Sequence, residues 1–163
     1  MLQRRFLTLP MLLALCGAPL AGCGKSADDY AKEAQAALDA GDAAKAQQEA
    51  NEGLKAAGSD KAVAWRLEKV RVDALAKEGK GKDIVADLAG LKTAYPTQAT
   101  AQFYKAVADK LATAGDKDGQ LAVLDAGNKS FPDDATFKTA IEGLKGAANS
   151  PEDVERLKAL GYL

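Results

Sequence analysis

The sequence contains no histidine, and this absence excludes several kinds of catalytic site. Serine–histidine and cysteine–histidine centres both need an imidazole, and so does histidine-ligated zinc. Histidine is also the ordinary general base near neutral pH. Acidic residues are present, but Ser26-Ala27-Asp28-Asp29 and Ser150-Pro151-Glu152-Asp153 have the pattern of helix caps followed by first-turn acids. We therefore predict that the chain is not an enzyme and needs neither a cofactor nor a metal.

Cysteine is nearly as scarce, since Cys16 and Cys23 are the two examples in 163 residues. Cys16 lies inside an apolar run that follows Arg4 and Arg5 and is interrupted by two prolines. The run is shorter than the roughly 20 residues of a membrane-spanning helix and is typical of a removable secretory signal. Its removal leaves one cysteine, so no intramolecular disulfide forms, and 20 basic against 23 acidic side chains, a net charge of −3. No basic face suits nucleic acid.

The tetrapeptide Leu20-Ala21-Gly22-Cys23 ends this apolar run. It resembles the bacterial lipobox, and the resemblance implies diacylation of the Cys23 thiol, cleavage before it and acylation of the new amino terminus. Gly24 follows where, by the enterobacterial rule, an aspartate would retain a lipoprotein in the inner membrane. The resemblance therefore implies a lipid anchor in the outer membrane, facing the periplasm. The alternative is an ordinary signal cleaved nearby, which would leave Cys23 free.

Beyond the cysteine, apolar residues recur at helical spacing, and no segment alternates with period two. Glycines separate the segments at Gly41-Asp42, Gly79-Lys80-Gly81 and Gly115-Asp116, where glycine can end one helix and aspartate can cap the next. The expected buried faces are Tyr30, Ala34, Ala37 and Leu38; Val63, Leu67, Val70 and Ala74; Ile84, Leu88, Leu91 and Tyr95; and Tyr104, Val107, Ala108 and Leu111. The pattern predicts a chain of helical hairpins.

Two hairpin ends are alike. The stretches "LKTAYPTQAT" (91–100) and "NKSFPDDAT" (128–136) each place an aromatic residue before proline and a polar capping run after it, 36 residues apart. The hairpins resemble tetratricopeptide repeats, whose period is 34 residues. The likeness is closest over 101–134 and looser over 27–60, while the unit over 64–97 is stretched at its turn and carries Arg71 where a small residue is expected. The resemblance implies an all-α helical-hairpin repeat solenoid with three degenerate repeats, a partial fourth and a C-terminal capping helix.

The predicted organisation therefore has four parts. They are a signal peptide over 1–22, a lipidated cysteine with a short polar spacer over 23–26, tetratricopeptide-like repeats over 27–148 and the capping helix over 149–163. In the capping helix we expect Val154, Leu157 and Leu160 on one side. Tyr162 and Leu163 either cover the last groove of the stack or dock on a partner.

In tetratricopeptide proteins the first helices of successive units line a concave groove that holds a segment of a partner. Carried over by position, the resemblance selects as candidate partner-binding residues Asp28, Gln35, Trp65, Glu68, Val72, Gln102, Lys105 and Asp109. Trp65 lies beside the apolar face of its helix, and tryptophan is enriched at binding hot spots, but packing between repeats is an equal alternative. For the charged residues the alternative is a solvated helix face.

One further pattern partly matches a calcium-binding loop: Asp116, Asp118, Gly119 and Asp125. Ala114 occupies the first ligand position, so we predict a turn without an ion.

The sequence thus predicts a membrane-anchored, non-enzymatic adaptor or assembly factor of the bacterial cell envelope. It would bind another envelope protein through the groove and the membrane through Cys23. The alternatives are a structural lipoprotein subunit that braces a larger envelope complex, and a binder of a cell-wall fragment or small ligand.

Overall fold

The computed structural model of the chain describes residues 24–163. In this part all regular secondary structure is α-helical, and no strand occurs. The helices of the described part are α1 (Ala27–Asp39), α2 (Ala43–Ala57), α3 (Lys61–Lys77), α4 (Gly81–Ala94), α5 (Ala101–Thr113), α6 (Lys117–Ser130), α7 (Ala135–Ala147) and α8 (Pro151–Ala159). The all-α prediction is confirmed. Over residues 24–163, no helix combines the length and apolar character that crossing a bilayer requires.

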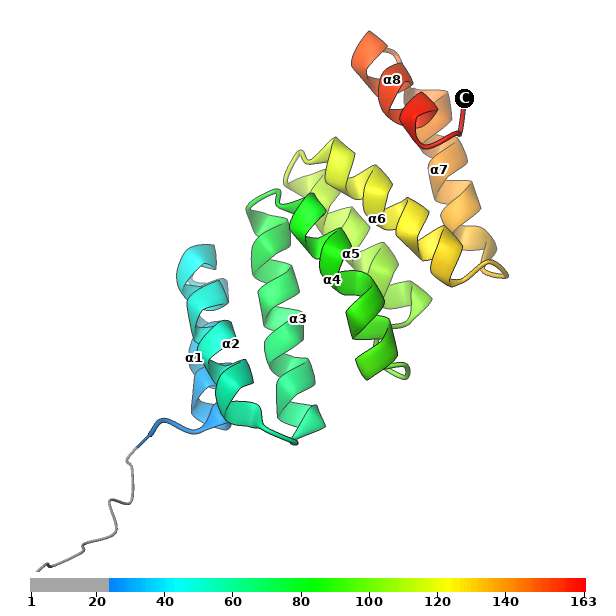
Figure 1. Ribbon diagram of the computed structural model, residues 1–163. Helices are drawn as coiled ribbons and strands as arrows, with labels where there is room; N and C mark the ends of the chain where they lie inside the picture. The colour runs from blue at the N-terminus through cyan, green and yellow to red at the C-terminus, as the bar shows by residue number, and fades with distance from the viewer. Residues whose placement is uncertain (1–23) are drawn as a thin grey trace, which may run out of the picture.

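The helices follow one another in a row, with α1 and α2 at one end and α7 and α8 at the other (Figure 1). Helix α1 packs on α2 and α3, α2 on α3, α3 on α4 and α5, α4 and α5 on α6, and α6 on α7 and α8. This packing of neighbours is consistent with a helical repeat. It also brings α1, α3 and α5 side by side, although other helices separate them in sequence.

Capping signals set the helix boundaries. The Ser26 hydroxyl accepts the backbone N–H of Asp29 at 3.2 Å, and the Asp29 carboxylate accepts the N–H of Ser26, which completes a capping box at α1. Asp42 and Asp116 cap α2 and α6, each directly after a glycine of positive φ. A side chain at positive φ is costly, so these glycines fix the turns. The predicted turns are confirmed.

The turn before α4 departs from this pattern, because Lys80 provides no side-chain cap. The carboxylate of Asp116 supplies the acceptor instead. Its Oδ2 accepts the N–H of Gly81 at 2.9 Å, and its Oδ1 accepts the N–H of Gly119 at 2.8 Å. A Cβ on Gly81 would lie 2.2 Å from the Cα of Gly119, so α4 and α6 meet here backbone to backbone. The glycine turn that looks stretched in the sequence is a packing point between two hairpins.

Buried apolar residues form two clusters, one around α1, α2 and α3 and the other from α3 to α8. Helix α3 takes part in both. It contributes Leu67 and Val70 to the first cluster and Val72 and Leu75 to the second, so two of its faces are buried. The residues of the four predicted apolar faces are buried, apart from two tyrosines that are half-buried. Helix α3 therefore separates the two clusters and contributes buried residues to each of them.

The residues after α8 turn back onto the helices. The backbone N–H of Tyr162 donates to the Leu157 carbonyl at 2.9 Å, and the Tyr162 hydroxyl donates to Asp125 Oδ1 at 2.8 Å. Leu160 is 38% exposed and Leu163 is 57% exposed. The prediction that Leu160 extends the side of the helix that carries Val154 and Leu157 is wrong, because the helix ends at Ala159 and Leu160 lies in the turn that follows.

Candidate functional site

The exposed faces of α1, α3 and α5 form an open hollow of about 630 Å³. Its lining residues are Gln35, Leu38, Asp39, Asp73, Lys77, Asp109, Lys110, Thr113 and Ala114. A second hollow of about 530 Å³ lies between α1 and α3, and it shares Gln35 and Asp39 with the first. Its other lining residues are Ala31, Lys32, Ala36, Arg66, Lys69 and Val70. We call the surface of these two adjoining hollows the α1–α3–α5 groove.

Polar contacts between helices hold this groove together. Asp73 of α3 pairs with Lys110 of α5 and, at 3.4 Å, with Lys69 on its own helix. The ammonium of Lys77 donates to the carbonyl of Leu38 at 2.7 Å, which ties α3 to the end of α1. Charges of both signs therefore line the groove, and several of them are used to fix the three helices relative to one another.

On α1 and α5 the predicted groove residues lie on or beside this surface. Gln35 and Asp109 line it, and Asp28 pairs with Arg66, which also lines it. Lys105 is exposed and bonds to Asp109 at 3.0 Å. Gln102 is exposed in the first turn of α5. The predicted residues of these two helices therefore share the side of the molecule that carries the groove, and their role in binding a partner stays a prediction.

On α3 the predicted face is wrong by one residue. Trp65, Glu68 and Val72 were expected in the groove, but the groove residues are Arg66, Lys69 and Asp73. Val72 is fully buried in the second core cluster. The sequence offered one signal for the correct register, since Arg66, Lys69 and Asp73 form a polar stripe at helical spacing.

Trp65 packs between helices. Its ring centroid lies 5.3 Å from that of Tyr95 and 5.1 Å from that of Phe103. The row of aromatic contacts continues through Tyr104 and Phe131 to Phe137 on α7. Tyr95 and Phe131 are the aromatic residues of the two aromatic-proline stretches, so these stretches serve the packing of one hairpin on the next.

Glu68 belongs to an ion-pair network between α3 and α4. Its carboxylate lies 2.8 Å from the guanidinium of Arg71, which also reaches Asp87 at the same distance. Burial opposes the charge on Arg71, but the two carboxylates outweigh it and raise the pKa of the guanidinium. The arginine that replaces a small residue in the family pattern therefore joins α3 to α4.

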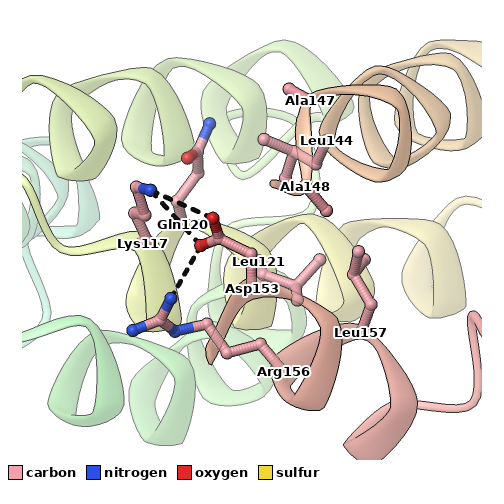
Figure 2. A pocket seen from close by; sticks show the side chains of 9 residues that line it. All are labelled: Lys117, Gln120, Leu121, Leu144, Ala147, Ala148, Asp153, Arg156 and Leu157. Atoms are coloured by element: carbon pink, nitrogen blue, oxygen red, sulfur yellow. Dashed lines mark hydrogen bonds and ion pairs between the residues drawn. The ribbon is translucent and has the colours of Figure 1, made fainter. Parts of the chain in front are cut away.

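A second candidate site is a cleft of about 120 Å³ between α6, α7 and α8 (Figure 2). Its walls are apolar and include Leu121, Leu144 and Leu157. On one side Asp153 lies between Lys117 and Arg156, at 3.2 Å and 2.8 Å from their nitrogens. The cleft is small beside the 300–1,000 Å³ of common ligand pockets. Its two cations are already paired with the carboxylates of Asp153 and Asp118.

The acidic residues of the partial calcium pattern are used elsewhere. Asp116 caps two helices, Asp118 pairs with Arg156, and Asp125 accepts from Tyr162 and lies 2.7 Å from the ammonium of Lys129. Across residues 24–163, no group of three or more histidine, cysteine, aspartate or glutamate side chains could hold a metal ion.

The predicted signal peptide and Cys23 lie outside the described residues, so cleavage and lipidation stay predictions. Comparison of the chain with protein-family models, with curated proteins and with solved structures finds no match in any of the three.

Proposed function

We propose that this chain is a lipid-anchored, non-enzymatic adaptor or assembly factor of the bacterial cell envelope. In this proposal residues 1–22 are removed, Cys23 is acylated, and the anchor lies in the outer membrane facing the periplasm. The groove then recruits another envelope protein. The observation that carries the recruiting role is the open α1–α3–α5 groove, a continuous surface to which three helices contribute.

We further propose that the helices form a tetratricopeptide-like solenoid. Helices α1–α2, α3–α4 and α5–α6 are its three degenerate repeats, α7 begins a fourth, and α8 caps the stack. Three features support this proposal: glycine turns inside the hairpins, aromatic-proline ends after α4 and α6, and contacts between neighbouring helices. The proposal makes the α1–α3–α5 groove the concave, partner-binding surface of the stack.

The chemistry of the groove favours a peptide segment as its occupant. Its side chains are mostly charged or amide groups, with exposed apolar groups at Ala36 and Ala114. Such a surface is matched by a segment that carries charges of both signs beside a few apolar residues. Tethering the adaptor to a membrane raises its effective concentration toward any partner in that membrane, so moderate affinity would be sufficient.

A bracing role within a larger complex is the second candidate. It is favoured by Leu160 and Leu163, which lie exposed at the C-terminal end of the described chain. In that role partner contacts would depend on the C-terminal end and would be insensitive to the groove. Binding of a small ligand comes third, because the groove is open and the cleft beside α8 is small.

A steric block separates these roles. Thr113 lines the groove, whereas Ala112, one residue earlier in the same turn of α5, is exposed and does not line it. We expect Thr113→Trp to lose an envelope protein that co-purifies with the chain from membranes, and Ala112→Trp to retain it. Loss with Leu163→Ala but not with Thr113→Trp would favour bracing. Cys23→Ala, followed by membrane fractionation, tests the anchor separately.

A further inference from the structure

Lys25, two residues after the predicted acylation site, is held against the folded chain. Its ammonium lies 2.6 Å from a carboxylate oxygen of Glu33 on α1 and 2.5 Å from one of Glu49 on α2. The same ammonium lies 4.1 Å from the centre of the Tyr30 ring. Three groups from two helices therefore fix a residue that the sequence places in a free polar spacer.

These contacts are partly shielded from water. The Lys25 side chain is 25% exposed, and its partners Glu49 and Glu33 are 18% and 54% exposed, so the pair with Glu49 is the shielded one; Lys55, which pairs with Glu52 in α2, is 71% exposed. Screening by salt is weaker for such a pair than for an exposed one. Burial is the largest influence on the pKa of Lys25 and lowers it, but the hydrogen bonds and charges of Glu33 and Glu49 together raise it.

The position of this contact limits where an anchor can lie. The Cα atoms of Cys23 and Lys25 are two residues apart, so at most about 7 Å separates them. Helices α1 and α2 contact each other and α3, and they form the end of the row away from α7 and α8 (Figure 1). A lipid on Cys23 would therefore lie beside this end of the molecule.

We propose that Lys25 locks the lipid tether against the α1–α2 hairpin, so that this end of the molecule faces the lipid surface. The α1–α3–α5 groove then starts near the membrane at α1 and continues away from it along α3 and α5. This inference rests on the proposed acylation of Cys23. In this proposal the segment between Cys23 and α1 fixes the orientation of the molecule on the membrane.

Charge attraction to anionic lipid is not what orients the molecule. Around Lys25 the carboxylates of Asp29, Glu33 and Glu49 outnumber the nearby ammonium of Lys32. Attraction to an anionic surface needs a cluster of lysine or arginine residues. In this proposal the covalent tether and the Lys25 contacts together orient the molecule.

The experiment uses the full lipidated chain, purified from membranes and reconstituted in phosphatidylcholine vesicles that contain a lipid with a spin-labelled headgroup. A fluorophore is attached to a cysteine at Ala56, exposed near the end of α2, or at Glu155, exposed on α8. The acylated thiol of Cys23 does not compete for the label. We expect the headgroup label to quench Ala56→Cys strongly and Glu155→Cys weakly.

Lys25→Ala should reduce the difference in quenching between the two positions, because the tether is then free to tilt, and Lys55→Ala, which breaks an exposed pair on α2, should preserve it. If circular dichroism shows that Lys25→Ala unfolds the chain, the double variant Glu33→Gln/Glu49→Gln keeps Lys25 and should have the same effect on the tether. Equal quenching of both positions in the wild-type background, or an unchanged difference when Lys25 is freed, would overturn the proposal. Failure of the chain to float with vesicles would instead refute the acylation on which the proposal rests.

Discussion

Gly127 lies inside α6, where the helix passes directly over the ring of Phe137. A Cβ at Gly127 would lie 2.2 Å from Cε1 and 2.6 Å from Cζ of that ring. The Phe137 side chain is fully buried, and its ring stacks on Phe131 with a centroid distance of 6.1 Å. The ring therefore has little room to move, and Gly127→Ala should force α6 and α7 apart.

Gly90 provides a matched control, because it also lies inside a helix and a Cβ there would meet no atom within 4 Å. In both variants alanine gains about 1 kcal/mol over glycine from helix propensity. Gly127→Ala in addition loses about 1–3 kcal/mol from overpacking. The propensity gain cancels in the comparison, so Gly90→Ala should be about 1–3 kcal/mol more stable than Gly127→Ala.

Urea unfolding followed by far-ultraviolet circular dichroism measures this difference, and thermal unfolding checks it. At about 2–4 °C per kcal/mol for a chain of this size, the two midpoints should differ by roughly 2–12 °C. Equal stability of the two variants would refute the close packing of α6 on α7.

Two other predictions concern packing and pH. Trp65→Ala should lower the free energy of unfolding by about 2–3 kcal/mol, less than for a fully buried tryptophan because Trp65 is half-buried, and urea unfolding measures it. If the folded variant also loses its partner, the placement of Trp65 outside the groove is wrong. The Ser150 hydroxyl and the Lys117 ammonium hold the pKa of Asp153 below its ordinary 3.8, so its stabilisation is present above that pH and is lost as the pH falls through the lowered value. Thermal midpoints should therefore fall less steeply below about pH 4 in Asp153→Asn than in the wild type, and identical slopes would contradict this reasoning.

The sequence predicted the helices well because their signals are local. Serine and aspartate caps and turn glycines set the ends of α1, α2 and α6. One apolar stripe at helical spacing was enough to identify the buried side of α1 and α5, which left the opposite side for the groove.

The exposed face of α3 was predicted wrongly for a physical reason. It packs on two core clusters, so apolar residues such as Leu67 and Val72 occupy different faces of it. A helix with two buried faces has no single apolar stripe, so its exposed side can be predicted only from its polar residues. The family pattern then placed the groove one residue away from Arg66, Lys69 and Asp73.

Contacts between residues far apart in the sequence could not be predicted from spacing. Asp116 caps α4 from the following hairpin because two glycines allow α4 and α6 to touch. Lys25 meets Glu49 only once α1 and α2 have folded against each other. Both contacts depend on tertiary structure, and neither leaves a local pattern.

We propose above that a partner occupies the α1–α3–α5 groove. In-cell photo-crosslinking tests it most directly, with a photoreactive residue at Asp109 in the groove or at Lys138, exposed on α7, and mass spectrometry of the membrane fraction. We expect one abundant envelope protein to be crosslinked from Asp109 and to be absent from Lys138. Equal crosslinking from both positions, or a partner captured from Lys138 alone, would contradict it.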